Sequence, residues 1–330
     1  MDQNKPLIVI GASTGGITAL KRIFSSLPPQ FPAPILAVVH IGSSESILPA
    51  IFGMSSSLPV WHAADGAAIE AGAILVAPSD HHLLVEDSRV RLSRGPKENH
   101  ARPAIDPLFR SAAIAHGGNV IGVVLTGNLD DGTVGLQAIK SYGGIAIVQD
   151  PADAEVPSMP RSALEYVDVD YCLPLDEIAS TLVRLADGPI ARRDAAEDNR
   201  KAIMENRYAA GEDPNALELD QIGTRSVQTC PECGGILWEM KGAAPVRFRC
   251  HTGHAFTSQS LLHLQNRFSE DVLWSAVRAL HEKHTLLLRL ASDARKRNAD
   301  STAAEHEAAA RLAAQHAEEL RKIIGEVGGK

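Results

Sequence analysis

The sequence of 330 residues is poor in cysteine and contains no long apolar run. Four cysteines in a chain of this length do not form the disulfide framework of a small secreted protein. No apolar stretch approaches the roughly 20 residues that a transmembrane helix requires. The first residues, Met-Asp-Gln-Asn-Lys-Pro, lack the features of a signal peptide. We therefore expect a cytoplasmic protein without membrane insertion.

An excess of positive charge is also missing. The chain has 32 Lys and Arg against 40 Asp and Glu, for a net charge of −8. A surface of this sign repels nucleic acid and anionic membranes, so we expect neither as the main partner. Hydrophobic residues make up 45% of the chain, enough to bury a core. The length predicts one large domain plus smaller units.

The first half of the chain repeats a short apolar run, a turn and a helical stretch. The runs at 7–10, 35–39, 120–125 and 144–148 are apolar on both faces, as strands of a parallel sheet covered by helices are. Segments 74–77, 82–86 and 89–93 instead alternate with period two, which predicts an antiparallel hairpin at a sheet edge. We therefore predict an α/β domain over residues 5–185, with a doubly wound, mostly parallel sheet and this edge hairpin.

A glycine-rich turn follows the first apolar run and precedes a helical stretch at 17–27. Its sequence, Gly-Ala-Ser13-Thr-Gly-Gly, matches the G-x-S-x-G turn on which a nucleophilic serine points away from the carboxyl edge of a sheet. Backbone N–H groups at the helix start, including that of Thr14, are candidates for an oxyanion hole. The alternative is a dinucleotide-binding loop. That loop requires an acidic residue at the end of the second strand, where this sequence has His40.

Two more polar residues follow predicted strands. His40 comes directly after the run at 35–39, and Asp131 lies in the turn after the run at 120–125. Because parallel strands bring their carboxyl ends to one edge, we expect both side chains near Ser13. A histidine base oriented by an acid is the arrangement that activates a serine for acyl transfer. The plainer alternatives are a strand-end histidine and a solvated Asp-Gly turn or helix N-cap.

These residues belong to segments that resemble, in order, the catalytic domain of protein-glutamate methylesterases of bacterial chemotaxis. The matching segments are 8–16, 38–40, 77–80, 102–106, 125–127, 131–132 and 159–161. The resemblance covers about residues 5–185, and the ordered set is highly specific. It implies a triad of Ser13, His40 and Asp131, the last preferred to Asp130 because the family's acid directly precedes a glycine.

The resemblance also implies a reaction and a partner: hydrolysis of glutamate methyl esters on the cytoplasmic helices of chemoreceptors, often with glutamine deamidation, and without a catalytic cofactor. Two features depart from the family pattern. Only a few residues precede the first strand, so we expect no receiver domain ahead of it, and Asn128-Leu129 replaces the Met-Gly common near the substrate. Arg102 and Arg161 are the candidates for orienting an acidic substrate or closing the pocket rim.

Cysteine and histidine gather in a second region, which we predict to be a zinc-ribbon-like module at 229–257. Cys230 and Cys233 are two residues apart around a tight turn, and Cys250 and His254 follow after the sixteen residues 234–249. This spacing predicts a structural zinc site, with packed thiols and no metal as the alternative. His251 is the weaker ligand, since neighbours along a strand point to opposite faces. The remaining thiol, Cys172, is expected in the core.

The rest of the chain is charged or helical. We predict a charged linker or exposed helix at 186–228, opened by the run 192–200, and a helical hairpin at 258–327 with a break near 298–302. An apolar stripe along the first helix is expected to form the inside of the hairpin; the alternative is a surface for docking or dimerisation. Its residues are Phe268, Val272, Leu273, Val277, Leu280, His284, Leu287 and Leu288.

The sequence thus favours a serine esterase acting on a protein methyl ester. A catalytically idle, esterase-like scaffold in a signalling complex is the alternative. A nucleotide-dependent oxidoreductase is disfavoured by His40.

Overall fold

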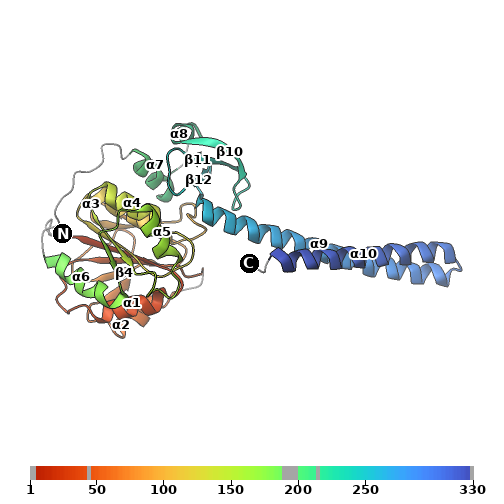
Figure 1. The fold of residues 1–330 in the computed structure, drawn as a ribbon, viewed down its shortest axis with the longest axis horizontal. Coiled ribbons are helices and arrows are strands. Elements are labelled where there is room, and N and C mark those ends of the chain that lie inside the picture. The colour runs from red at the N-terminus through yellow and green to blue at the C-terminus, as the bar shows by residue number, and fades with distance from the viewer. Residues whose placement is uncertain (1–4, 43–45, 188–199, 213–215, 328–330) are drawn as a thin grey trace. The chain divides into compact units, whose positions relative to one another are not determined.

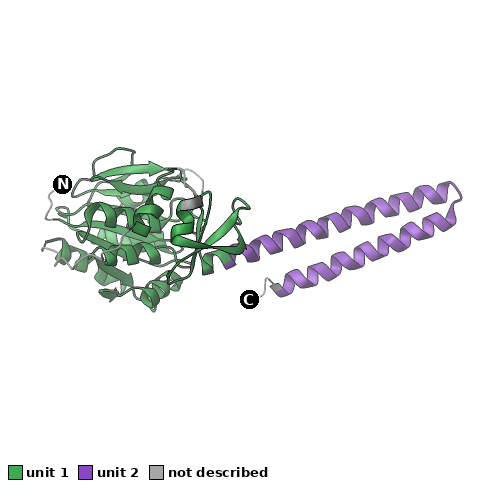
Figure 2. Ribbon diagram, turned by 90° about the horizontal axis from the view of Figure 1, so that it is seen from above, with its two compact units in different colours: residues 1–261 green, residues 262–330 purple. Residues whose placement is uncertain are grey.

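A computed structural model describes residues 5–42, 46–187, 200–212 and 216–327. The chain forms two compact units, Met1–Leu261 and Leu262–Lys330 (Figures 1 and 2). No helix within the described ranges is long and apolar enough to cross a bilayer.

The first unit is built around a seven-stranded sheet whose strands all pair in parallel, in the order β3-β4-β2-β1-β7-β8-β9. The strands are β1 (Leu7–Ala12), β2 (Ile35–Val39), β3 (Val60–His62), β4 (Ile74–Val76), β7 (Val120–Val124), β8 (Ile145–Gln149) and β9 (Tyr171–Leu173). All residues of β1, β2 and β7 are buried. The predicted parallel sheet is confirmed.

Helices cover both faces of this sheet (Figure 1). One face packs against α1 (Gly16–Ser25), α2 (Leu48–Gly53) and α6 (Leu175–Asp187), and the other against α3 (Ile105–His116), α4 (Thr133–Ser141) and α5 (Ser158–Tyr166). Alternate side chains of β1 enter the two layers: Ile8 and Ile10 join one core cluster, Leu7 and Val9 the other. This burial on both sides explains why the strands read as continuous apolar runs.

The antiparallel hairpin consists of β5 (His82–Glu86) and β6 (Arg89–Ser93), with the bounds predicted. It forms a separate two-stranded sheet and does not extend the main one, whose edge strands are β3 and β9. Leu83, Val85 and Val90 bury their side chains in the same cluster as α3, and Val85 N donates to Ser111 Oγ at 3.0 Å. The hairpin therefore lies against α3. Segment 74–77, grouped with it by periodicity, contributes the parallel strand β4.

Residues 200–261 also belong to the first unit. Helices α7 (Arg200–Ala209) and α8 (Ala216–Ile222) precede an antiparallel sheet of β10 (Gly223–Thr229), β11 (Ile236–Met240), β12 (Arg247–Cys250) and β13 (Ala255–Thr257). Its small core contains Tyr208, Leu219, Ile222, Trp238 and Met240. The predicted charged run 192–200 lies outside the described residues except for Arg200, which begins α7. Two helices and all but the last residue of β10 thus lie within the predicted linker 186–228; the domain boundaries themselves stay a prediction.

The second unit is a pair of long antiparallel helices, α9 (Ser258–Lys296) and α10 (Asp300–Val327), lying side by side in Figure 2. Asn298, with φ of 59°, forms the turn between them, where the break was predicted. The interface is lined by small side chains, and Val277 is buried in it. Leu273, Leu280, His284 and Leu287 are half-buried, whereas Phe268, Val272 and Leu288 of the predicted stripe are exposed.

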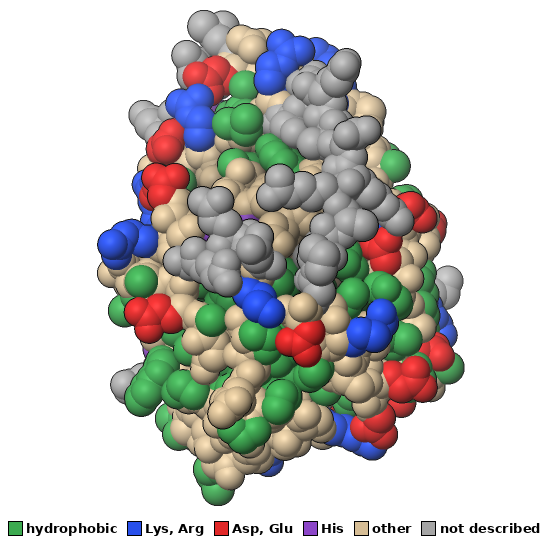
Figure 3. All heavy atoms as spheres, turned by 90° about the vertical axis from the view of Figure 1, so that its left-hand side faces the viewer, with side chains coloured by type: hydrophobic (Ala, Val, Ile, Leu, Met, Phe, Trp, Pro, Cys, Tyr) green, Lys and Arg blue, Asp and Glu red, His purple; other side chains and the backbone are tan. Residues whose placement is uncertain are grey.

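The molecular surface in Figure 3 shows Lys and Arg interspersed with Asp and Glu on the face that it draws. That face carries no large patch of one sign among its described residues.

Candidate active site

The predicted nucleophile lies in a tight turn between β1 and α1. Ser13 is half-buried, and its backbone N–H donates to Thr126 O at 3.0 Å. Gly15 has φ of 79°, and a Cβ there would lie 2.7 Å from the Glu155 carboxylate. Glycine is therefore favoured at this position by the backbone conformation, and a larger residue would also displace the Glu155 side chain. The turn presents Ser13 at the carboxyl edge of the sheet.

Strand register places the second predicted residue beside the first. Ala12 pairs with Val39 across β1 and β2, so Ser13 and His40 are the next residues along two neighbouring strands. His40 N donates to Ala12 O at 3.1 Å, which extends the ladder to the edge. On the other side, a Cβ at Gly127 would lie 2.7 Å from Ser13 Cβ. The loops after β1, β2 and β7 therefore converge on Ser13.

The imidazole and the predicted acid are in direct contact. His40 Nε2 lies 2.7 Å from Asp131 Oδ2, and the side chains of His40 and Asp131 are 21% and 3% exposed. The Asp131 carboxylate also accepts backbone N–H groups of Ile105 at 2.7 Å and Gly132 at 3.0 Å. Burial alone would raise its pKa, but the hydrogen bond and charge of His40, with the N–H donors of Ile105 and Asn99, lower the Asp131 pKa to about 2. Asp131 is held ionised, and it fixes one imidazole nitrogen.

A second buried carboxylate lies beside Asp131, in a position that the sequence did not reveal. Asp106 Oδ1 accepts from Gly132 N at 3.0 Å and Gly135 N at 2.6 Å. Burial and the neighbouring Asp131 charge raise the pKa of Asp106 well above its usual value. Asn99 Nδ2 donates to Asp131 Oδ1 and Asp106 Oδ2, both at 3.1 Å. One amide therefore bridges two buried carboxyl groups, of which Asp106 has the raised pKa and Asp131 the lowered one.

The oxyanion candidate Thr14 and Asn128, which we expect near the substrate, contact each other at this turn. Asn128 Nδ2 donates to Thr14 Oγ1 at 2.9 Å, and both side chains are exposed. Within the described part of the chain, the Thr14 N–H makes no backbone hydrogen bond. It is available to a ligand at the edge where Ser13 lies.

Comparison with known proteins identifies the family of this domain. The family model described as CheB methylesterase matches residues 8–182, more than half of the chain. The chain belongs to the CheB methylesterase family. The predicted resemblance and α/β fold class are thereby confirmed.

Two relatives and one solved structure show how far the similarity extends. A protein of Leptospira interrogans with the provisional name protein-glutamate methylesterase/protein-glutamine glutaminase is 43% identical over 192 residues, 58% of this chain and 100% of that protein. Protein-glutamate methylesterase/protein-glutamine glutaminase 2 of Anaeromyxobacter dehalogenans is 43% identical over 54% of this chain and 53% of its own length. The crystal structure of the Thermotoga maritima CheB methylesterase catalytic domain matches with a TM-score of 0.53 and 36% identity, covering 55% of this chain and 98% of that one. The similarity to CheB methylesterases thus corresponds to the sheet domain.

The two arginines singled out in this CheB-family domain have different surroundings. Arg102 donates to Asp80 Oδ1 at 2.6 and 2.9 Å and to the carbonyl oxygens of Arg94 and Gly95 at 3.0 and 2.8 Å. Arg161 is exposed on α5, and its guanidinium makes no ion pair among the described residues. Met159, two residues earlier, donates its backbone N–H to Gly127 O at 3.0 Å. This hydrogen bond joins α5 to the loop after β7, which lies beside Ser13. A substrate contact stays a prediction for both arginines.

The four predicted ligands outside the CheB domain come together. Cys230, Cys233, Cys250 and His254 place one ligand atom each within 4.8 Å of all the others. Cys233 and Cys250 Sγ are 3.7 Å apart, too far for a disulfide bond of about 2.05 Å. His251 is not in this group and packs over Gly235. The group can bind a metal ion, whereas Cys172, expected in the core, is an exposed thiol on edge strand β9.

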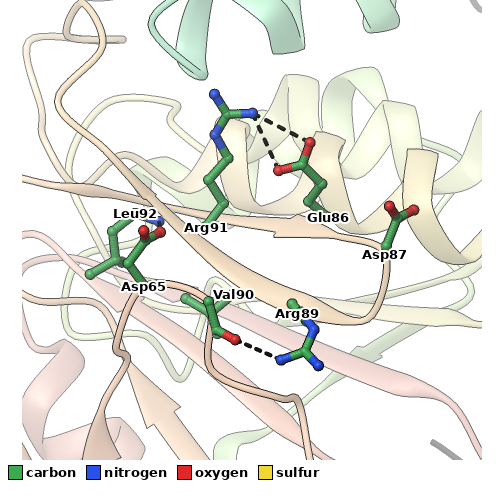
Figure 4. A pocket seen from close by; sticks show the side chains of 8 residues that line it. Asp65, Glu86, Asp87, Arg89, Val90, Arg91 and Leu92 are labelled. Carbon is green, nitrogen blue, oxygen red and sulfur yellow. Dashed lines mark hydrogen bonds and ion pairs between the residues drawn. The ribbon is translucent and has the colours of Figure 1, made fainter.

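A shallow charged pocket lies at the turn end of the hairpin (Figure 4). Arg91 pairs there with Glu86 at 3.2 Å, and Arg89 donates to Gly66 O at 2.9 Å. Its lining includes none of the predicted site residues.

Proposed function

We propose that this chain hydrolyses glutamate methyl esters on a protein substrate, with Ser13 as nucleophile, His40 as base and Asp131 as the acid that orients the base. The 2.7 Å contact between His40 Nε2 and Asp131 Oδ2, at the strand end next to Ser13, is the observation that carries the proposal. The names of the relatives, which include methylesterase and glutaminase, support the same chemistry.

Acylation follows from this arrangement. Asp131 accepts a hydrogen bond from His40 Nε2–H, so the proton of the neutral imidazole stays on Nε2 and Nδ1 carries the lone pair that takes the proton from Ser13 Oγ. Oγ attacks the ester carbonyl carbon, and the negative charge moves to the carbonyl oxygen. We assign its stabilisation to the Thr14 N–H, with Asn128 beside it. The imidazolium then protonates the leaving methoxide, methanol departs, and an acyl-serine remains.

Deacylation uses the same groups in the same roles. His40 takes a proton from water, the hydroxide attacks the acyl carbon, and Ser13 Oγ leaves with the proton from His40. The product is a glutamate carboxylate. A glutamine side chain follows the same route with ammonia as the leaving group, which accounts for the glutaminase part of the relatives' names.

The proposed substrate is a methyl-accepting chemoreceptor or a related signalling protein, as the family resemblance implies, and the reaction then takes place in the cytoplasm. Such substrates are acidic helices, and exposed Arg161 is the better placed of the two arginines to meet one, because Asp80 and two carbonyl groups occupy Arg102. The exposed apolar residues of α9, among them Phe268, Val272 and Trp274, are where helix-mediated docking or homo-oligomerisation is expected.

A structural zinc ion fits the Cys/His group. Tetrahedral zinc, with bonds of about 2.3 Å to sulfur and 2.0–2.1 Å to nitrogen, separates two sulfur ligands by about 3.8 Å and sulfur from nitrogen by about 3.5 Å. The Cys233–Cys250 Sγ distance is 3.7 Å and the Cys250 Sγ–His254 Nδ1 distance is 3.6 Å. Four protein ligands leave no open coordination position, so we assign the ion to structure and no step of ester hydrolysis to it.

The test is methanol release from a methylated chemoreceptor signalling fragment by the parent and by Ser13→Ala. The mutant is expected to lose at least about 10³-fold in kcat, because the nucleophile is gone. Thr18→Ala is the matched control, since Thr18 is an exposed residue of α1, five positions further along.

Three outcomes separate the alternatives. Release by the parent and by Thr18→Ala but not by Ser13→Ala supports the esterase. If the parent cleaves only a nitrophenyl ester, the proposed triad is supported but the chemoreceptor is rejected as the substrate. No cleavage of either ester favours the idle scaffold and overturns the proposal.

A further inference from the structure

The strand that follows the Cys/His group lies against a loop of the sheet domain. β13 begins directly after His254, and its Ala255 N donates to Lys97 O at 3.2 Å. Asn99 N in turn donates to Ala255 O at 2.8 Å. Backbone hydrogen bonds therefore join the segment 97–99 to the end of the metal-ligand group.

The same strand orients the Asn99 side chain. Asn99 Oδ1 accepts from Thr257 N at 3.1 Å and from Ser260 Oγ at 3.0 Å. Its Nδ2, as described above, donates to Asp131 and Asp106. Rotating the amide by 180° would turn its oxygen toward two carboxyl groups and its NH₂ toward two donors, so this network selects one orientation. Asn99 thus connects β13 and the start of α9 to the acid of the triad.

Buried ion pairs fix this contact. Glu98, next to Asn99, accepts from Arg110 of α3 at 2.7 Å and from Arg249 of β12 at 3.1 Å. Glu205 of α7 pairs with Arg247 at 2.9 Å. Glu98, Arg110 and Arg249 are at most 3% exposed. The sheet domain and the Cys/His module share one buried set of charges. Separating the two would leave charged side chains without their partners, which is unfavourable.

The metal-ligand group contacts the same loop from its other half. Glu232, between Cys230 and Cys233, pairs with His100 and, at 3.5 Å, with Lys97. Cys250 N donates to His254 O at 3.0 Å and so closes the turn from which β13 starts. Both pairs of ligands are therefore connected to residues 97–100: Cys230 and Cys233 through Glu232, and Cys250 and His254 through β13.

We propose that metal binding by Cys230, Cys233, Cys250 and His254 controls the esterase in cis by holding Asn99 against Asp131. Asn99 is a positioning residue that contacts neither substrate nor metal ligand; it orients Asp131, and Asp131 orients His40. The inference rests on the proposed function of the triad and adds to it a regulator within the same chain. Loss of the metal loosens the 250–254 turn and the start of β13, while the buried ion pairs keep the module attached; Asn99 then loses the two donors to its oxygen, and the triad acid loses a fixed hydrogen bond.

The test compares zinc-loaded and chelator-stripped full-length protein, with metal content measured by atomic emission, in the parent and in Asn99→Gly. Glycine is chosen because Asn99 has φ of 50°, which alanine adopts poorly. Asn298→Gly is the matched control, an exposed asparagine with φ of 59° in the α9–α10 turn. Activity is measured with a nitrophenyl ester, and hydrogen exchange is followed in peptides covering 97–106, 255–260 and β1.

Zinc-loaded Asn99→Gly is expected to lose about 10–100-fold in kcat, by analogy with the loss when a hydrogen bond that orients a metal-ligating side chain is removed. Its KM should stay within about twofold of the parent value. Stripping the parent should produce a similar loss, reversed by zinc, while stripping Asn99→Gly should add less than about twofold, because both changes break one connection. Exchange should accelerate in 97–106 and 255–260 and stay unchanged in β1. Asn298→Gly should behave as the parent.

Full kcat in metal-free parent, or a further tenfold loss on stripping Asn99→Gly, would overturn the proposal, since the metal then acts elsewhere or not at all. Hydrogen exchange separates this failure from that of the esterase. If loaded parent cleaves no ester, faster exchange at 97–106 on stripping still supports the coupling, and unchanged exchange rejects it.

Discussion

Two regions of the first unit, the carboxyl edge of the parallel sheet and the Cys/His module, each gather residues that are far apart in the sequence. At the sheet edge, backbone ladders between fully buried strands set Ser13 beside His40. The module instead has short strands, several exposed residues along β10 and a small apolar core. Its segments meet at the Cys/His group and at buried ion pairs.

This difference predicts how each region responds to change. A site fixed by a buried ladder keeps its geometry when one functional side chain is replaced, so mutations there affect activity more than stability. A region fixed by polar contacts loses stability when one partner is removed, because the other is left buried and unpaired.

Asp131→Asn should produce the largest effect, a loss of about 10³–10⁴-fold in kcat with the fold retained. The amide carries no charge to balance the imidazolium, and its NH₂ group can donate to the imidazole and so favour the tautomer that cannot take the Ser13 proton. The measurement is ester hydrolysis together with circular dichroism. Asp87→Asn, in the β5–β6 turn where φ is 46°, is the control and should keep full activity. Equal activity of the two variants would remove Asp131 from the triad.

Arg249→Met should act on stability in the module. Arg249 is 1% exposed, donates to Glu98 and Gly253 O, and lies 5.1 Å from the Tyr208 ring centre. Removing one member of a buried charge cluster costs about 3–5 kcal/mol of unfolding free energy. Arg225→Met, whose partner Asp220 is on the surface, should cost less than about 1 kcal/mol. Urea unfolding measures both, and similar midpoints would show that the buried cluster does not stabilise the module.

The comparison also explains what the sequence reveals. β2, β5 and β6 have the predicted bounds because each carries an apolar pattern over five residues. Strands β3 and β9 were not predicted, since each has three residues of which at most one is buried, too few to show an apolar pattern. The position of Cys172 on edge strand β9 depends on strand order, which one sequence does not contain.

The predicted triad residues are recognisable because each follows a strand, so the chain itself points to the shared edge. Asn99 gives no such signal. It lies in a loop at positive φ, and its partners come from α3, from the turn after β7 and from β13. The position of the Asn99 side chain depends on contacts between segments up to 161 residues apart, and a local sequence pattern contains no information about such contacts.

Asp130→Asn should have the smallest effect and test the junction between the two regions. Asp130 is 1% exposed; its Oδ1 accepts from Thr257 Oγ1 at 2.8 Å, and its Oδ2 has no partner among the described residues. Burial, with the Asp131 charge, raises the Asp130 pKa from 3.8 to about 6. Because the folded pKa is the higher one, this carboxyl stabilises the fold fully below about pH 4, and that contribution is lost as pH rises through about 6.

Asparagine keeps an acceptor for Thr257 and carries no charge. We therefore expect Asp130→Asn to gain about 1–3 kcal/mol in unfolding free energy over the parent at pH 8, and little of that difference at pH 4. Urea unfolding across this range measures it, with Asp87→Asn again as the exposed control. A difference between variant and parent that does not change with pH would mean that Asp130 reaches enough solvent to ionise freely, and that the junction between sheet and module is open to water there.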